Sequence, residues 1–348
     1  MSDPAKPAAP SLMAVEAAEA PAVVARQIAD SGAAFAALGE RLRRAPPPVV
    51  VTCARGSSDH AALYGKHVIE TTLGCPVASV GPSVASVYGV RPAVRGALFV
   101  AVSQSGRSPD LLRLTEAARD GGALVVGFVN DMTSPLPELC EVAIPLAAGA
   151  ERSVAATKSC LAAMAGLLQL AAQWSQDAAL LDAVRGLPEL LAQALGCDWG
   201  GALAPLARAA GLYVVGRGPG FGVACEMALK LKETCRLHGE AFSAAEVVHG
   251  PLALVGPDFP VLAVSQPDAA APHTEAVVRR MAAMGAPVWL AGTTMPGASA
   301  LPVPKGAPAA TLPLAALLSF YRAVDGLARA RGLDPDRPPH LSKVTETV

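Results

Sequence analysis

The sequence predicts an α/β protein made of two copies of one unit, each a parallel sheet flanked by helices. First, short apolar runs alternate with helical stretches, and strands that are apolar throughout are typical of parallel sheets covered on both faces. Second, the chain repeats itself: ARGSS at 54–58 matches GRGPG at 216–220, and AVSQ occurs at 101–104 and 263–266. Both pairs are 162 residues apart and follow apolar runs, which indicates a duplicated unit.

The elements follow one another in the order that such a duplication requires. We expect a tail and helical lead-in over 1–45, a first unit over 46–195 and a second unit over 196–348. Within the first segment, we expect a tail over residues 1–11 and a helix-rich lead-in over residues 12–45. The predicted strands are 48–54, 97–103, 123–129, 142–146, 212–217, 260–265 and 287–292. The predicted helices are 58–74, 108–120, 221–238, 273–284 and 312–331, with a long helical tract over 154–195.

Composition narrows the class of protein. A chain of 348 residues, 52% hydrophobic and 16% charged, can bury two cores, while a net charge of −1 and 4% aromatic residues do not favour nucleic-acid binding. Seven cysteines without a C-x-x-C pair favour a reducing, cytoplasmic location over a zinc site or disulfide framework. The first residues lack a secretory signal, and we interpret 159–176 as a buried or interface helix, not a membrane span.

Two hydroxyl-rich loops lie between a predicted strand and the helix after it. One carries Gly56, Ser57 and Ser58, and the other is SQSGRS at 103–108. Helix N-termini offer unpaired N–H groups to an anion, and serine hydroxyls add short donors, so the loops favour a phosphate site. Ordinary helix capping is the alternative. In the second copy AVSQ continues as PDAA, so that copy has lost the hydroxyls. No P-loop pattern is present.

Candidate acid–base residues gather in the second copy. Glu226, Lys230 and Glu233 share one face of the helix predicted over 221–238. Solvated ion pairs explain this spacing as well, but the flanking residues are apolar, and a partly desolvated carboxylate near a lysine can shuttle protons. His249 lies in a loop before Gly-Pro, and Lys343 lies in a C-terminal segment that could fold over a site or remain frayed.

Six motifs together resemble the sugar isomerase (SIS) family. They are ARGSS, SQSGRS, SVAATKS, MALKLKE, VVHGPLAL and the terminal LSKVTETV. The likeness runs from about residue 13 to the end and is greatest to the isomerase half of glucosamine-6-phosphate synthase and its stand-alone relatives. It implies a fold of two tandem flavodoxin-like SIS domains.

The resemblance also implies roles for single residues. It places the carboxylate that moves a proton between sugar C1 and C2 at Glu233, a lysine one helical turn earlier at Lys230, and a sugar-contacting acid at Glu226. The ring-opening histidine falls on His249, donated by the neighbouring subunit of a homodimer, and the tail lysine able to form a Schiff base with an open-chain ketose falls on Lys343. The implied substrate and phosphate site comprises Gly56, Ser57, Ser58, Ser103, Gln104, Ser105 and Ser108.

Differences from the synthase set the expected activity. Ala156 replaces a typical serine and Arg107 a frequent acid. The first cysteine is Cys53, and 52 residues cannot hold a glutaminase domain, so we expect no glutamine-derived ammonia. The expected enzyme is therefore a glucosamine-6-phosphate deaminase that forms fructose 6-phosphate and ammonia from a hexosamine 6-phosphate, without a metal or cofactor.

Three alternatives remain at this point. A galactosamine-6-phosphate deaminase/isomerase and a deglycase for a sugar-phosphate amine adduct share the same chemistry. A non-catalytic sugar-phosphate sensor is a different class, since SIS domains also occur in regulators that usually carry a helix-turn-helix. The near-neutral charge does not favour a DNA-binding sensor, and the chain retains the glutamate, histidine and lysines that catalysis would need.

Overall fold

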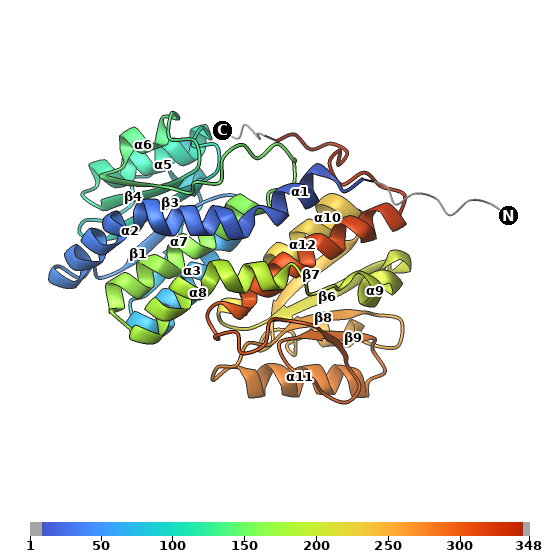
Figure 1. The fold of residues 1–348 in the computed structure, drawn as a ribbon. Helices are drawn as coiled ribbons and strands as arrows, with labels where there is room; N and C mark the ends of the chain where they lie inside the picture. The colour runs from blue at the N-terminus through green and yellow to red at the C-terminus, as the bar shows by residue number, and fades with distance from the viewer. Residues whose placement is uncertain (1–8, 344–348) are drawn as a thin grey trace.

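The computed structural model describes residues 9–343 and places them in two parallel five-stranded sheets with helices on both faces of each (Figure 1). The strand order is β2-β1-β3-β4-β5 in the first sheet and β7-β6-β8-β9-β10 in the second. The two orders correspond strand for strand, and both have the 2-1-3-4-5 order of flavodoxin-like sheets. The predicted α/β fold with two copies of one unit is therefore confirmed.

Most strands lie where apolar runs predicted them, and the exceptions are at sheet edges. The first sheet contains β1 (Val50–Cys53), β2 (Val77–Ser79), β3 (Leu98–Ser103), β4 (Leu124–Val129) and β5 (Val142–Pro145). The second contains β6 (Gly211–Gly216), β7 (His238–Ser243), β8 (Val261–Val264), β9 (Val288–Ala291) and β10 (Ser299–Leu301). The sequence did not predict β2, β7 or β10. All three are edge strands, short or partly exposed, so they lack a continuous apolar run.

The helices surround both sheets. The first part of the chain contains α1 (Leu12–Ala18), α2 (Ala20–Arg44), α3 (Ser57–Leu73), α4 (Ser83–Ser86), α5 (Pro109–Asp120), α6 (Leu136–Leu139), α7 (Lys158–Ser175) and α8 (Ala178–Ala194). The second contains α9 (Gly200–Leu203), η1 (Ala204–Arg208), α10 (Pro219–Cys235), η2 (Pro251–Leu254), α11 (Ala271–Ala283) and α12 (Leu312–Ala330). The tract predicted over 154–195 is two helices, because Gln176 adopts the left-handed conformation (φ 58°). The helix predicted over 221–238 ends at Cys235 for the same reason, at Arg236 (φ 47°).

The largest hydrophobic core lies between the two sheets. It joins side chains of β3 and β8 through α7, α10 and α12, while smaller clusters cover the outer faces under α5 and α11. Nearly every residue of α7 is buried, as the interpretation of 159–176 requires. Within residues 9–343, none of the helices has both the length and the apolar character that crossing a bilayer demands.

Two equivalent helices, α3 and α10, cross where the two units meet. A Cβ atom at Gly222 of α10 would lie 2.6 Å from the Tyr64 nitrogen and 2.9 Å from the His60 oxygen of α3, so glycine permits the close approach. Farther along α10, Glu226 contacts His60 and Lys230 contacts Ser57. The helices therefore run in opposite directions, which brings the C-terminal half of α10 to the N-terminus of α3.

Candidate active site

The two hydroxyl-rich loops meet at one cavity of about 350 Å³. They follow β1 and β3, which are neighbours in the parallel sheet, so both carboxyl ends open on the same edge. The Ser103 hydroxyl accepts a hydrogen bond of 2.9 Å from the Gly106 nitrogen and shapes the second loop. Gly106 has a φ of 63°, and a Cβ there would overlap Ser134. Among the predicted site residues, the cavity wall includes Gly56, Ser57, Ser58, Ser103, Gln104, Ser105, Ser108, Glu233 and Lys343.

An arginine that the sequence analysis did not assign also lines this cavity. The Arg55 guanidinium donates to one oxygen of Asp110 from Nη2 at 2.6 Å and from Nε at 3.2 Å. The Asp110 side chain is fully buried, whereas that of Arg55 is 48% exposed. The buried carboxylate thus orients a cation at the edge of the cavity. Arg55 belongs to the repeated ARGSS stretch, which was the available sequence signal.

Helix α10 contributes Glu233 to the cavity wall, and Lys230 pairs with Glu233 from behind the wall. The Lys230 amine is fully buried, donates to the Ser57 hydroxyl at 3.1 Å and contacts Glu233, whose carboxylate reaches the cavity. Burial by itself lowers the pKa of Lys230, but Glu226 and Glu233 outweigh burial and raise it above its ordinary value. Lys230 is therefore a fixed positive charge that positions Glu233, not a proton acceptor near neutral pH.

Glu226 lies behind this pair, outside the cavity wall. Its fully buried carboxylate is 3.3 Å from the Lys230 amine, accepts a hydrogen bond from the Tyr321 hydroxyl at 2.9 Å and lies 2.9 Å from His60 Nδ1. Burial tends to raise the pKa of Glu226, but Lys230, His60 and Tyr321 outweigh burial and lower it. Glu226 therefore contacts Lys230 and not the cavity itself, and its expected contact with a sugar stays a prediction.

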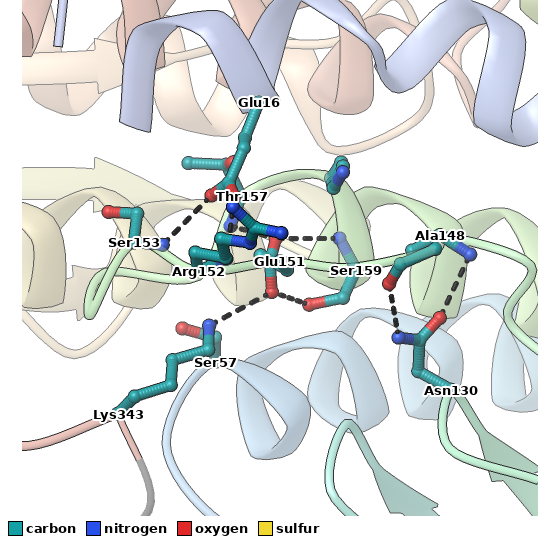
Figure 2. A network of polar contacts seen from close by, with 12 residues as sticks. Glu16, Ser57, Asn130, Ala148, Glu151, Arg152, Ser153, Thr157, Ser159 and Lys343 are labelled. Carbon is teal, nitrogen blue, oxygen red and sulfur yellow. Dashed lines mark hydrogen bonds and ion pairs between the residues drawn. The ribbon is translucent and has the colours of Figure 1, made fainter. Parts of the chain in front are cut away.

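The C-terminal segment closes one side of the cavity. Leu341, Ser342 and Lys343 line it, and the Lys343 amine lies 3.3 Å from the Glu151 carboxylate (Figure 2). Glu151 precedes the SVAATKS motif, and sequence reasoning did not identify it. Ala156, Ser159 and Cys160 add further wall near the start of α7.

His249 is a further predicted site residue that does not line this cavity, as Glu226 and Lys230 do not. It is exposed in the turn before η2, where its backbone nitrogen donates to the Glu246 oxygen at 2.9 Å. The expected donation of His249 by a second subunit stays a prediction. Within residues 9–343, no three His, Cys, Asp or Glu side chains form a group that could hold a metal ion.

The cavity brings two kinds of polar group together. Serine hydroxyls, Arg55 and the N-terminus of α3 line one part of it and offer hydrogen-bond donors of the kind that suit an anion. Glu233 on the same cavity can accept and return a proton, and Lys343 presents a primary amine. Such a cavity suits a small phosphorylated molecule whose opposite end undergoes proton transfer.

Comparisons with known proteins find similarity over most of the chain. The SIS domain family model matches residues 47–173 and 206–300. The chain is 35% identical to glutamine–fructose-6-phosphate aminotransferase (isomerizing) of Aeropyrum pernix over 84% of its length, and it spans about half the length of the curated relatives it matches.

Solved structures share the whole fold. A protein of Silicibacter pomeroyi DSS-3, provisionally assigned as a phosphosugar isomerase, is 43% identical with a TM-score of 0.88, covering 94% of this chain and 100% of its own. The C-terminal domain of glucosamine-fructose-6-phosphate aminotransferase from Francisella tularensis is 24% identical with a TM-score of 0.82, covering 97% of this chain and 100% of that domain. The second likeness concerns the fold alone.

Proposed function

This chain belongs to the SIS domain family, and we propose that it is a phosphosugar isomerase acting as a glucosamine-6-phosphate deaminase. The products are fructose 6-phosphate and ammonia. The observation that carries the proposal is the single cavity in which hydroxyl-rich loops, Arg55, Glu233 and Lys343 meet. The names of the A. pernix and S. pomeroyi relatives, an isomerizing aminotransferase and a phosphosugar isomerase, support the substrate class.

The phosphate is anchored first. Its oxygens accept hydrogen bonds from the Ser57, Ser58, Ser103, Ser105 and Ser108 region, and Arg55 supplies positive charge. Anchoring one end of the sugar orients C1 and C2 toward Glu233, which converts a random encounter into an oriented one. Gly56 matters because its φ of 54° lets the backbone turn directly into α3.

Proton transfer follows in the open-chain sugar. Glu233 removes the proton from C2 and returns it to C1. The aldehyde oxygen gains one proton and the C2 amino group loses one as it becomes an imine, so the step is a net tautomerisation. Water then adds to C2, ammonia leaves, and the ketose carbonyl remains, so no external oxidant or reductant is required. The protonated Lys230 stabilises negative charge that develops in the enolamine intermediate. Lys343 holds the open chain through its amine.

Ring opening requires a second subunit in this proposal. His249 lies outside the cavity of its own chain and, as the acid–base group for ring opening, serves the cavity of a partner in a homodimer. Mixing inactive His249→Ala and Glu233→Gln proteins after partial unfolding and refolding tests this. Heterodimers would contain one intact site, so activity recovers to about a quarter of wild type. No recovery, with exchange of subunits verified, would place His249 in its own site or outside catalysis.

Product analysis tests the reaction itself. Purified protein is incubated with glucosamine 6-phosphate, galactosamine 6-phosphate and N-acetylglucosamine 6-phosphate, and both ammonia and ketose phosphate are measured. Equal amounts of ammonia and fructose 6-phosphate from glucosamine 6-phosphate alone are expected. Ketose without ammonia would indicate simple isomerisation, preference for the galactosamine compound would change the epimer, and binding without product would favour a sensor.

A further inference from the structure

Glu151 is a buried carboxylate whose two oxygens both have donors. Oε1 accepts hydrogen bonds from the backbone nitrogens of Thr157 at 3.0 Å and Ser159 at 3.1 Å, at the start of α7. Oε2 accepts from the Ser159 hydroxyl at 2.5 Å and from the Lys343 amine at 3.3 Å. The Glu151 side chain is 0% exposed. A buried carboxylate is expensive without a cation, and Lys343 supplies that charge from the cavity side.

The loop that carries Glu151 is fixed from two directions (Figure 2). The Asn130 side chain donates to the Gly149 oxygen at 2.8 Å and accepts from the Ala148 nitrogen at 2.9 Å. The buried Glu16 carboxylate of α1 accepts from the nitrogens of Arg152 at 2.6 Å and Ser153 at 3.1 Å. Glu151 is therefore held in place independently of the C-terminal segment.

Lys343, by contrast, comes from a segment without helix or strand. Asp336, at the beginning of this segment, accepts hydrogen bonds from the Leu12 and Met13 nitrogens at 2.6 and 2.9 Å and so ties it to α1. A lysine side chain has four rotatable bonds and loses considerable entropy when it is fixed. Seven residues beyond Asp336, the ion pair with Glu151 gives the amine one defined position on the cavity wall.

We propose that Glu151 is a positioning residue that docks the amine of Lys343 in the sugar-phosphate cavity. The inference rests on the proposed function, because it assigns Lys343 to the open-chain sugar. Without Glu151 the amine is present but displaced, and misplacement of a reacting group by about 1 Å can cost about a hundredfold in rate. Glu151 itself has no role in anchoring the phosphate.

Covalent trapping of Lys343 measures this position directly. With fructose 6-phosphate, the Lys343 amine adds to the C2 carbonyl and one water leaves, forming an imine. Sodium borohydride then delivers hydride to the imine carbon and solvent protonates the nitrogen, leaving a stable secondary amine. Mass spectrometry of the C-terminal peptide quantifies the product, and kcat and KM for glucosamine 6-phosphate are measured in parallel.

Glu151→Gln is the test variant and Glu16→Gln the matched control. Both replace a buried carboxylate that orders the same loop, but Glu16 does not contact Lys343. We expect Glu151→Gln to reduce the trapping rate and kcat by about a hundredfold with KM changed less than about threefold. In Glu16→Gln the amide oxygen can still accept from one loop nitrogen and Asn130 still fixes the loop, so its trapping rate should stay within about threefold of wild type. Glu151→Asp, which restores the charge at a shorter reach, recovers part of the loss.

The outcomes separate this inference from the proposed function. If wild-type protein neither forms product nor traps Lys343, the proposed function fails. If wild type does both and Glu151→Gln matches it, or if Glu16→Gln loses as much trapping, the positioning role is wrong. Should Glu151→Gln not fold, Glu151→Asp decides: unchanged trapping overturns the inference. Glu151→Gln combined with Lys343→Ala should have the same kcat as Lys343→Ala alone, and an additive loss would overturn it too.

Discussion

The two units place nearly the same backbone at the ends of their first strands but use it differently. Helices α3 and α10 begin and end 162 residues apart, and the glycines before them, Gly56 and Gly218, share one conformation (φ 54°, ψ −131° and φ 56°, ψ −134°). In the first unit this turn opens on the cavity. In the second, the buried Gln266 side chain donates to the Arg217 oxygen at 2.8 Å and covers the turn.

The side chains that follow explain the difference. Ser57 of the first unit corresponds to Pro219, which has neither a hydroxyl nor an N–H, so the second turn has no donor at this position. Conversely, α10 has Lys230 and Glu233 where α3 has Val68 and Thr71. In the proposed function, one copy thus carries the anion-binding groups and the other the acid–base groups. The antiparallel crossing of α3 and α10 brings both sets to one cavity.

Glu233→Gln should have the largest effect, because it removes the acid–base group of the second unit and leaves the first unit intact. We expect kcat to fall by about 10²–10⁴-fold, while the affinity for glucosamine 6-phosphate, measured by calorimetry, changes little. Glu240→Gln, an exposed acid on β7, is the control. Loss of binding together with kcat would contradict the division between the units.

Glu226→Gln should destabilise the junction of the units at neutral pH by about 3–5 kcal/mol, because the buried Lys230 loses a charged partner. The pKa of Glu226 is lower in the folded protein than its ordinary value, so its contribution is present above that value and declines as pH falls through the folded-state pKa. Urea unfolding from pH 7 to pH 3 should therefore show the difference between wild type and variant narrowing on the acid side. A constant difference would exclude ionised Glu226 as its source.

Arg55→Ala should weaken substrate binding by the first unit, whereas Glu233→Gln should slow the reaction. Loss of the cation should raise KM about 10–100-fold with a smaller change in kcat. Arg217→Ala, at the equivalent position of the covered turn, should leave KM unchanged. Steady-state kinetics of both variants checks this. Thermal unfolding measures the loss of stability that follows when the buried Asp110 carboxylate has no partner. Equal changes in KM would mean that the second turn also contacts the substrate.

Ser103→Ala and Ser265→Ala compare the equivalent hydroxyls with the smallest expected effects. The Ser103 hydroxyl accepts from the Gly106 nitrogen, so its removal should cost about 1–3 kcal/mol in unfolding free energy and raise KM. The buried Ser265 hydroxyl has no hydrogen-bond partner among the described residues, so its loss should be neutral or slightly stabilising. Denaturant unfolding measures the free energies of both variants. A larger loss of stability for Ser265→Ala than for Ser103→Ala would contradict the difference in hydrogen bonding between the two hydroxyls.

Sequence by itself determined the fold class, the duplication and the two hydroxyl-rich loops that line the cavity. Apolar runs mark the central strands because those strands are buried on both faces, and glycine with serine marks turns that leave backbone donors free. Such signals depend only on residues that are neighbours in the sequence. They can therefore be recognised without knowing which segments pack together. The edge strands β2, β7 and β10 lacked them because an edge strand is short or partly exposed.

Tertiary structure decided which polar groups share a cavity. Spacing on α10 put Glu226, Lys230 and Glu233 on one face, but the crossing with α3 at Gly222 determined that Glu226 is covered and Glu233 reaches the cavity. Glu151 and Lys343 lie 192 residues apart, and only the folded chain pairs them. Local sequence specifies local backbone, whereas burial and charge pairing depend on which distant segments pack together.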